Sequence, residues 1–220
     1  MSQFRLANQS LVALAQRDLT DFWSALNVGG SPLLVRDAVL EFFPELLTTY
    51  GDTAAVLAGD FYDELRDVPP SAARFSALLA QPAKPDVAAT DARWALGQLF
   101  QSEPDPDAVL ALLGGVTQRL ILQAGRDTIA DSVYRDPVRT GYARVPTGAS
   151  TCRWCVMLAS RGAVYGSAAA AGAQGNKYHG HCDCVPTPIR SRDDYPEGYD
   201  RKAYERLYQE GSGIGRDLAE

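Results

Sequence analysis

All four cysteines and both histidines of this 220-residue chain lie between Cys152 and Cys184. The first two cysteines, in Cys152-Arg-Trp-Cys155, have the C-x2-C spacing with which one tight turn presents two thiolates to the same ion. The second half of the cluster, HGHCDC from His179 to Cys184, offers four more donors. Because structural zinc takes four nitrogen or sulfur ligands in a tetrahedron, this spacing predicts a zinc site.

We expect the ligands to come from Cys152, Cys155, His179, Cys182 and Cys184. Side chains alternate along a strand, so Cys182 and Cys184 would point to the same face and could both bind the ion. One of them could also bind beside a histidine, and the spacing leaves the second-half pair open. Two alternatives to a metal also remain open, namely disulfides and buried reduced thiols.

A structural metal fits this part of the chain better than a catalytic one. The roughly 40 residues around the cluster have few large apolar side chains, so a bound ion would supply folding free energy that their core lacks. A catalytic zinc keeps an open position and a nearby general base. Asp183 is the one acidic residue in the second half, and alternation turns it away from the thiolates. We therefore predict no catalytic and no cofactor-binding residues, with a Cys–His nucleophile pair and a metal-dependent nuclease as weaker alternatives.

The first 135 residues have the periodicity of helices. Apolar residues recur at threes and fours over residues 4–26, 86–100 and 107–134. A further helix begins after Ser31. Pro44 predicts a kink or break in it near Phe43, Gly51 predicts its end, and Asp52 would cap another helix that runs to residue 65. Between two proline-rich connections, residues 72–79 predict a short helix.

After residue 135 the chain becomes rich in proline and glycine. We expect a helical turn or two at CVMLAS, short strands at GAVYGS and CDCVPTPI, and a short amphipathic helix in DRKAYERLYQEG. The predicted fold class is mainly α: a helical N-terminal body (1–135), a small loop-rich α+β module stapled by zinc through its Cys/His residues (136–192), and a polar tail with a short helix (193–220).

The distribution of charge and of apolar residues indicates which partners and which cellular compartment to expect. The net charge is −6, but residues 144–192 carry about +5 and the rest of the chain about −11. A basic module could meet nucleic acid or an acidic protein surface, although an acidic body repels phosphates. We find no continuous apolar run that could span a bilayer and no signal-peptide pattern, so we expect a reducing cytosol, where clustered cysteines are more often ligands than disulfides.

The stretches RVPTGASTCRWCVMLASRG and YHGHCDCVP resemble the C-terminal motif of phage minor head proteins of the Mu F-like head-morphogenesis family, particularly the versions from phages of actinobacteria. Members of that family carry a C-x2-C pair followed by a His-x2-Cys-x-Cys signature. Here the signature falls on His179, Cys182 and Cys184, which leaves His181 as the extra donor. The resemblance covers about 50 residues, from Arg144 to about Arg192.

This resemblance implies a structural minor capsid protein, present in the phage head and in the host cytoplasm during assembly. The implied partners are the portal protein and a major capsid or scaffold protein, with phage DNA as a further candidate and no membrane. The implied role is in procapsid assembly or in DNA packaging and delivery. Two alternatives remain: an enzyme of head assembly, either a capsid maturation protease or a Cys/His-cluster nuclease, and a zinc-binding adaptor that contacts nucleic acid.

Overall fold

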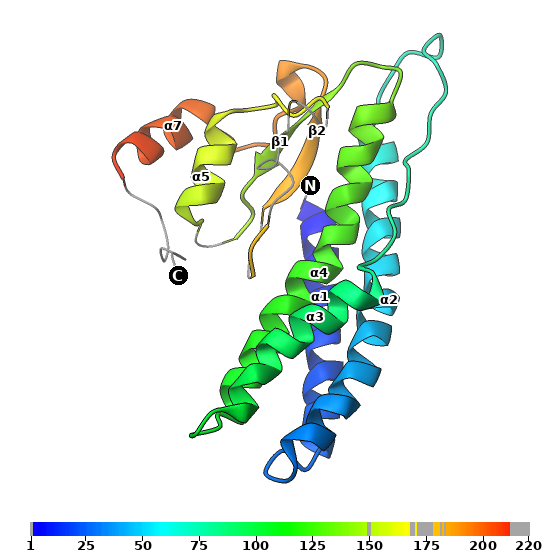
Figure 1. The fold of residues 1–220 in the computed structure, drawn as a ribbon. Coiled ribbons are helices and arrows are strands. Elements are labelled where there is room, and N and C mark those ends of the chain that lie inside the picture. The colour runs from blue at the N-terminus through cyan, green and yellow to red at the C-terminus, as the bar shows by residue number, and fades with distance from the viewer. Residues whose placement is uncertain are drawn as a thin grey trace.

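The structure, a computed structural model, describes residues 2–148, 151–167, 170, 178–180, 182 and 184–211. Helices dominate it, which confirms the predicted mainly α class (Figure 1). Along the chain the elements are α1 (Ser2–Ala25), α2 (Pro32–Leu65), α3 (Pro85–Leu96), the 3-10 helix η1 (Gly97–Phe100), α4 (Pro106–Arg135), β1 (Gly141–Val145), α5 (Arg153–Ser160), β2 (Val185–Ile189), the 3-10 helix η2 (Arg192–Asp194) and α7 (Arg201–Gln209).

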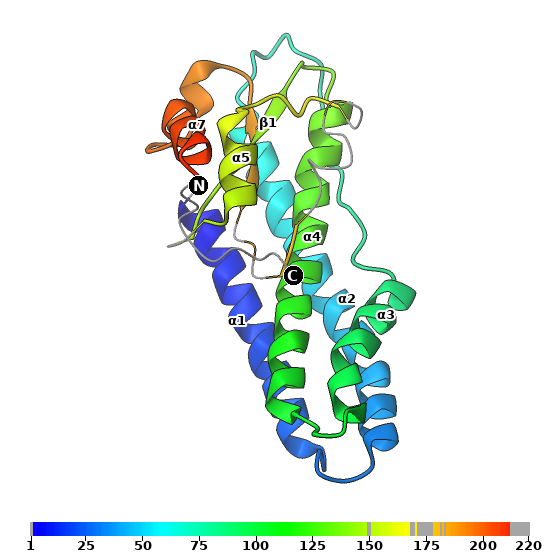
Figure 2. The same cartoon turned by 60° about the vertical axis from the view of Figure 1, so that its left-hand side comes forward.

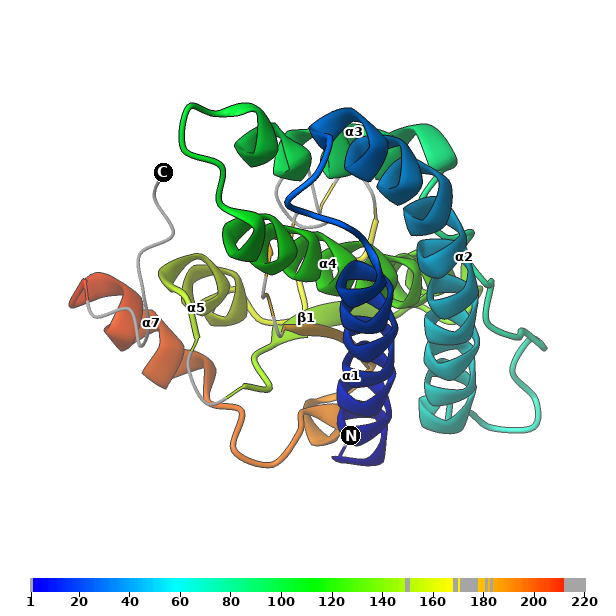
Figure 3. The same ribbon diagram turned by 90° about the horizontal axis from the view of Figure 1, so that it is seen from below.

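Helices α1 to α4 form a bundle, and α4 contacts the other three (Figure 3). Helices α2 and α4 run side by side in the same direction, and α1 runs opposite to both (Figure 1). The two long helices approach closely at Gly125, where an added Cβ atom would lie 2.9 Å from the carbonyl oxygen of Ala54. Buried apolar residues from all four helices form the main core, including Leu19, Phe43 and Leu113.

The predicted break near Phe43 and the predicted helix end at Gly51 are wrong, because α2 is one helix of 34 residues. Pro44 removes one backbone hydrogen bond of the helix, but Phe43 is fully buried in the main core, and that packing holds the helix together. Gly51 does not end the helix; its lack of a side chain lets the connection between α2 and α3 pack closely against α2. A Cβ atom at this position would lie 2.7 Å from Cβ of Pro82, in the connection that crosses α2.

That connection, between α2 and α3, also replaces the predicted helix at residues 72–79. Residues 73–84 have no regular secondary structure, and their backbone donors bond to side chains of α2 and α4 instead of to one another. The three hydrogen bonds run from Ala77 N to Asp63 Oδ1, from Leu78 N to Ser132 Oγ and from Ala80 N to Thr128 Oγ1, each 2.8–2.9 Å. Local helical propensity is overridden because the neighbouring helices already satisfy these donors.

Strands β1 and β2 pair antiparallel, from Gly141 opposite Ile189 to Val145 opposite Val185. This confirms the strand expected at the end of CDCVPTPI. The two prolines of β2 alternate with residues that can bond to β1, so they are tolerated in a two-stranded sheet. The strand expected at GAVYGS is reduced to one bridge, between Tyr165 and Tyr142. The helices expected at CVMLAS and in the polar tail are present as α5 and α7.

The C-terminal elements share a second core with one end of the helical bundle (Figure 2). Its buried members come from α1, α2, α4, β1, α5, β2 and the segment after α5, and they include Phe4, Phe61, Tyr62, Ile129, Val133, Tyr142, Leu158, Tyr165 and Val185. The division into a body, a module and a tail stays a prediction, but this core places the Cys/His segment against α4.

Helix α4 is long enough to cross a membrane, and the mean hydropathy of an 18-residue window in it is high enough as well. This test averages over the window, whereas the prediction from the sequence rests on continuous apolar runs. Among the described helices it alone passes this test, which core helices of soluble proteins also pass. Half of that window is buried inside the protein, where α4 packs against three neighbouring helices. The expected absence of a membrane partner stays a prediction.

Candidate metal centre

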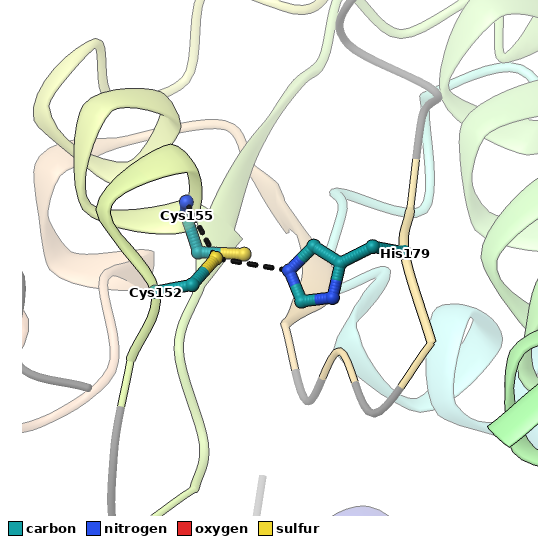
Figure 4. A group of neighbouring side chains, drawn as sticks. All are labelled: Cys152, Cys155 and His179. Atoms are coloured by element: carbon teal, nitrogen blue, oxygen red, sulfur yellow. Dashed lines mark hydrogen bonds between the residues drawn. The ribbon is translucent and has the colours of Figure 1, made fainter. Parts of the chain in front are cut away.

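The first half of the cluster lies at the N-terminus of α5. Cys152 is the N-cap of this helix, and its Sγ accepts a hydrogen bond of 3.3 Å from the backbone N–H of Cys155. The C-x2-C residues therefore form the first turn of α5, and this turn places the sulfur atoms of Cys152 and Cys155 close together (Figure 4). Cys155 is buried, whereas Cys152 is partly exposed.

The second half reaches the first across the fold. The backbone N–H of Cys182 donates to the carbonyl oxygen of His179 at 3.3 Å, which makes a tight turn of the same spacing as Cys152 to Cys155. His179 Nε2 lies 2.9 Å from Cys152 Sγ (Figure 4), and Cys155 Sγ lies 3.5 Å from Cys182 Sγ. Cys184, directly before β2, is fully buried.

The structure thus brings all five predicted donors into one cluster. The donor atoms of Cys152, Cys155 and His179 lie within 4.8 Å of one another, and so do those of Cys155, Cys182 and Cys184. Cys155 belongs to both groups. Five donors exceed the four of tetrahedral zinc, and the distances do not single out the set that would bind. His181 and Asp183 lie outside the described residues.

All four thiols are free. The 3.5 Å between the sulfur atoms of Cys155 and Cys182 is far longer than a disulfide bond, which is about 2.05 Å. Disulfides, one of the alternatives to a metal, are therefore not formed in this structure.

The cluster favours ionised sulfur at two of its cysteines. The hydrogen bond with the Cys155 thiol, followed by the one from His179, lowers the pKa of Cys152 to about 4. The hydrogen bond to Cys152 raises the pKa of His179 to about 9. Hydrogen bonds from Cys155 and Cys184, together with nearby arginines, lower the pKa of Cys182. A thiolate is the form of cysteine that binds metal, and beside an imidazolium it is also a nucleophile.

The other two cysteines tend to keep their protons. Hydrogen bonding to its neighbours Cys152, Cys182 and Cys184 raises the pKa of Cys155. Burial is the main cause that raises the pKa of Cys184. The raised pKa values of Cys155 and Cys184 mean that binding of a cation to these two sulfur atoms would release their protons.

Two buried arginines flank the cluster, and neither was predicted from the sequence as part of the site. Arg126 of α4 is 5% exposed and Arg144 of β1 is 0% exposed. Their guanidinium groups stack against the ring of Tyr178, at 3.9 Å and 3.7 Å from its centroid. An arginine inside a short strand that is otherwise apolar, GYARV, was the available signal for Arg144. Nothing comparable marks Arg126 within the long α4.

A pocket of about 220 Å³ lies beside the cluster, between α1 and α4. Cys184 and Arg126 contribute to its wall, together with amide side chains such as Gln9 and Gln118. Among the described residues that line it there is no carboxylate and no histidine.

A sequence model of the family described as VG15 protein matches residues 1–211 of the chain. The chain is similar to the Gene 15 protein of Mycobacterium phage L5, with 29% identity in an alignment of length 226; the alignment covers 80% of this chain and 72% of that protein. It is also similar to the Gene 15 protein of Mycobacterium phage D29, with 28% identity in an alignment of length 219; that alignment covers 81% of this chain and 74% of the D29 protein. No solved structure matches it.

Proposed function

The chain belongs to the VG15 family of phage proteins, and from this premise we propose that it is a structural minor capsid protein of a tailed phage, of the Mu F-like head-morphogenesis type. It is located in the phage head, and in the host cytoplasm during assembly, and acts in procapsid assembly or in DNA packaging and delivery. Its partners are the portal protein and a major capsid or scaffold protein, with phage DNA as a further candidate.

The observation that carries this proposal is the gathering of the C-x2-C and His-x2-Cys-x-Cys residues into one cluster, in a chain related to mycobacteriophage proteins. These are the positions at which the chain resembles Mu F-like proteins. Sulfur and imidazole donors at these distances suit zinc, the usual ion of sites rich in Cys and His.

The zinc site is structural in this proposal. It joins the start of α5 to the segment before β2, two parts of the chain that are linked in sequence by a long connection. A closed site with four protein ligands would leave no open position for a substrate. The ion would add its binding free energy to the stability of the folded C-terminal segment.

Metal analysis of the purified chain under reducing conditions tests the zinc site. We expect about one zinc ion per chain, and a clear loss of zinc in Cys152→Ser. Ser10→Ala, an exposed position on α1, serves as the control and should keep its metal. A chain that binds no metal when refolded with zinc would exclude the site.

Assembly tests the capsid role. Procapsids made by co-expression of the chain with its phage's portal, scaffold and major capsid proteins should contain it in few copies. Portal alone, immobilised, should retain the chain. Particles that lack it, together with no retention by portal, would contradict the proposal.

One observation favours a second candidate, an enzyme of head assembly. The Cys152 thiolate beside the His179 imidazolium has the arrangement of a cysteine nucleophile and its acid–base partner. Cleavage of scaffold or capsid protein in the same co-expression, abolished by His179→Ala, would support a maturation protease. Intact scaffold and capsid proteins in assembled particles would count against it.

A further inference from the structure

Two cations lie next to the proposed ligands, and they come from different parts of the fold. Arg126 projects from the C-terminal half of α4, and its Nη2 donates to the carbonyl oxygen of Cys182 at 2.6 Å. Arg144 projects from β1, and its Nη2 lies 4.0 Å from Cys182 Sγ. Tyr178, directly before His179, is stacked between the two guanidinium groups. Both arginines thus hold the segment that carries the second-half donors.

The guanidinium of Arg126 is buried, and a buried positive charge requires a nearby negative charge to compensate for lost hydration. A guanidinium that is 5% exposed has lost most of its hydration, and an unpaired buried charge is strongly destabilising. Within the described part of the chain, no carboxylate forms an ion pair with Arg126 and its Nη1 has no hydrogen-bond partner. The nearby negative charges that interact with Arg126 are those of the Cys182 sulfur and of the adjacent Asp127 carboxylate, and Arg126 donates its short hydrogen bond to the backbone of Cys182.

A zinc ion bound by three thiolates and one neutral imidazole carries a net charge of about −1, and one bound by four thiolates about −2. Such a complex is anionic and buried, so it needs nearby positive charge as much as Arg126 needs negative charge. Arg126 also belongs to a helix of the N-terminal bundle and not to the Cys/His segment itself.

We propose that Arg126 couples metal binding to the attachment of the Cys/His segment to helix α4. This inference rests on the proposed zinc site. The guanidinium stabilises the anionic metal complex from outside the ligand set, and the complex in turn stabilises the buried guanidinium. Metal binding therefore strengthens the contact of α4 with Tyr178 and Cys182, and loss of the metal weakens it.

Cobalt(II) binding tests this coupling, because cobalt bound by thiolates absorbs visible light and zinc then displaces it. The variants are Arg126→Met, which removes the charge at similar length, and Arg126→Lys, which keeps the charge. Arg119→Met on the same helix is the matched control, since Arg119 pairs with Asp91 at a partly exposed position. Residues that act on a metal from outside its ligand set typically change affinity about 10- to 100-fold.

We expect Arg126→Met to weaken cobalt and zinc binding about 10- to 100-fold, with an unchanged cobalt spectrum because the ligands are the same. Arg126→Lys should retain part of the affinity, and Arg119→Met all of it. The increase in melting temperature that zinc produces should be smaller in Arg126→Met than in the wild type. A residue that only supports the fold would lower the melting temperature of the loaded and metal-free forms equally.

Wild-type affinity in Arg126→Met, or an unchanged zinc-induced increase in melting temperature, would overturn this inference and leave the zinc site standing. Absence of cobalt and zinc binding by the wild type would overturn both proposals. If Arg126→Met does not fold, Arg126→Lys decides: an affinity lower than that of Arg119→Met supports the role of Arg126, and an affinity equal to that of Arg119→Met contradicts it.

Discussion

At the scale of single residues, two buried carboxylates outside the Cys/His cluster predict how the stability of the protein depends on pH. The carboxylate of Asp136, at the end of α4, is fully buried and pairs with Arg66 Nε at 2.7 Å. Tyr62 Oη donates to the same carboxylate at 2.9 Å. Burial alone would raise the pKa of Asp136, but the hydrogen bonds from Arg66, Val138 N–H and Tyr62 outweigh it and lower the pKa below its usual value.

Asp136→Asn should therefore destabilise the protein by about 3–5 kcal/mol, because it leaves the charge of Arg66 without its buried partner. A lowered pKa in the folded state means that this stabilisation is complete above about pH 4 and is lost as the pH falls through the folded-state value. Urea unfolding at pH 7 and pH 3 measures both effects. Asp91→Asn, which breaks a partly exposed pair, should cost no more than about 1 kcal/mol. Equal losses of stability in Asp136→Asn and Asp91→Asn would show that the buried ion pair contributes no more than the partly exposed one.

Asp127 shows the opposite shift. Burial is the main cause that raises its pKa to about 6, against a hydrogen bond from Gln123 that lowers it. A raised pKa in the folded state means that the protonated form is favoured, so stability falls as the pH rises from about 4 through 6. Asp127→Asn should remove this dependence and raise stability at pH 8 by about 3 kcal/mol. A stability curve parallel to that of the wild type between pH 4 and 8 would show that the carboxylate is not desolvated.

At the scale of elements, the contact between α2 and α4 depends on Gly125. An alanine there would place Cβ 2.9 Å from a backbone oxygen that cannot move without shifting α2. Gly125→Ala should cost about 1–3 kcal/mol by overpacking, although alanine favours helix. Gly114→Ala on the same helix meets nothing within 4 Å and should stabilise the protein by up to about 1 kcal/mol. Thermal unfolding of the two variants gives the comparison, and a stabilised Gly125→Ala would show that the helices separate freely.

The elements also show where local sequence signals were sufficient. Apolar periodicity predicted α1 and α3, because each buries one stripe against the bundle, and it also predicted α4, although the buried residues of α4 lie on several faces of the helix. The break and the helix end predicted from Pro44 and Gly51 in α2 are wrong, and so is the short helix predicted at residues 72–79. There, Gly51 and the backbone donors of the connection are explained by contacts with residues distant in sequence, such as Pro82, Thr128 and Ser132.

At the scale of the whole molecule, two large hydrophobic cores stabilise different parts of the fold. The main core lies within the helical bundle, and the second joins the bundle to the C-terminal elements near the proposed metal centre. If zinc stabilises only the latter part, its removal should loosen the C-terminal segment and leave the bundle folded.

Chelation of the metal should thus lower the onset of thermal unfolding but keep most of the helical circular dichroism signal. Limited proteolysis should then cut first near residues 178–184, and an added excess of zinc should restore protection. Complete loss of helix on chelation would show that the bundle depends on the ion. No change in either measurement would show that the ion contributes no stability.

The sequence by itself determined the mainly helical class, the loop-rich character after residue 135 and the five donors that come together in one cluster. These follow from periodicity and spacing, which act over a few residues. The tertiary structure alone decided the continuity of α2, the extended connection at residues 73–84 and the placement of Arg126 and Arg144 beside the sulfurs. Each of these depends on contacts between residues far apart in the chain, and such contacts leave no periodic signal in either partner.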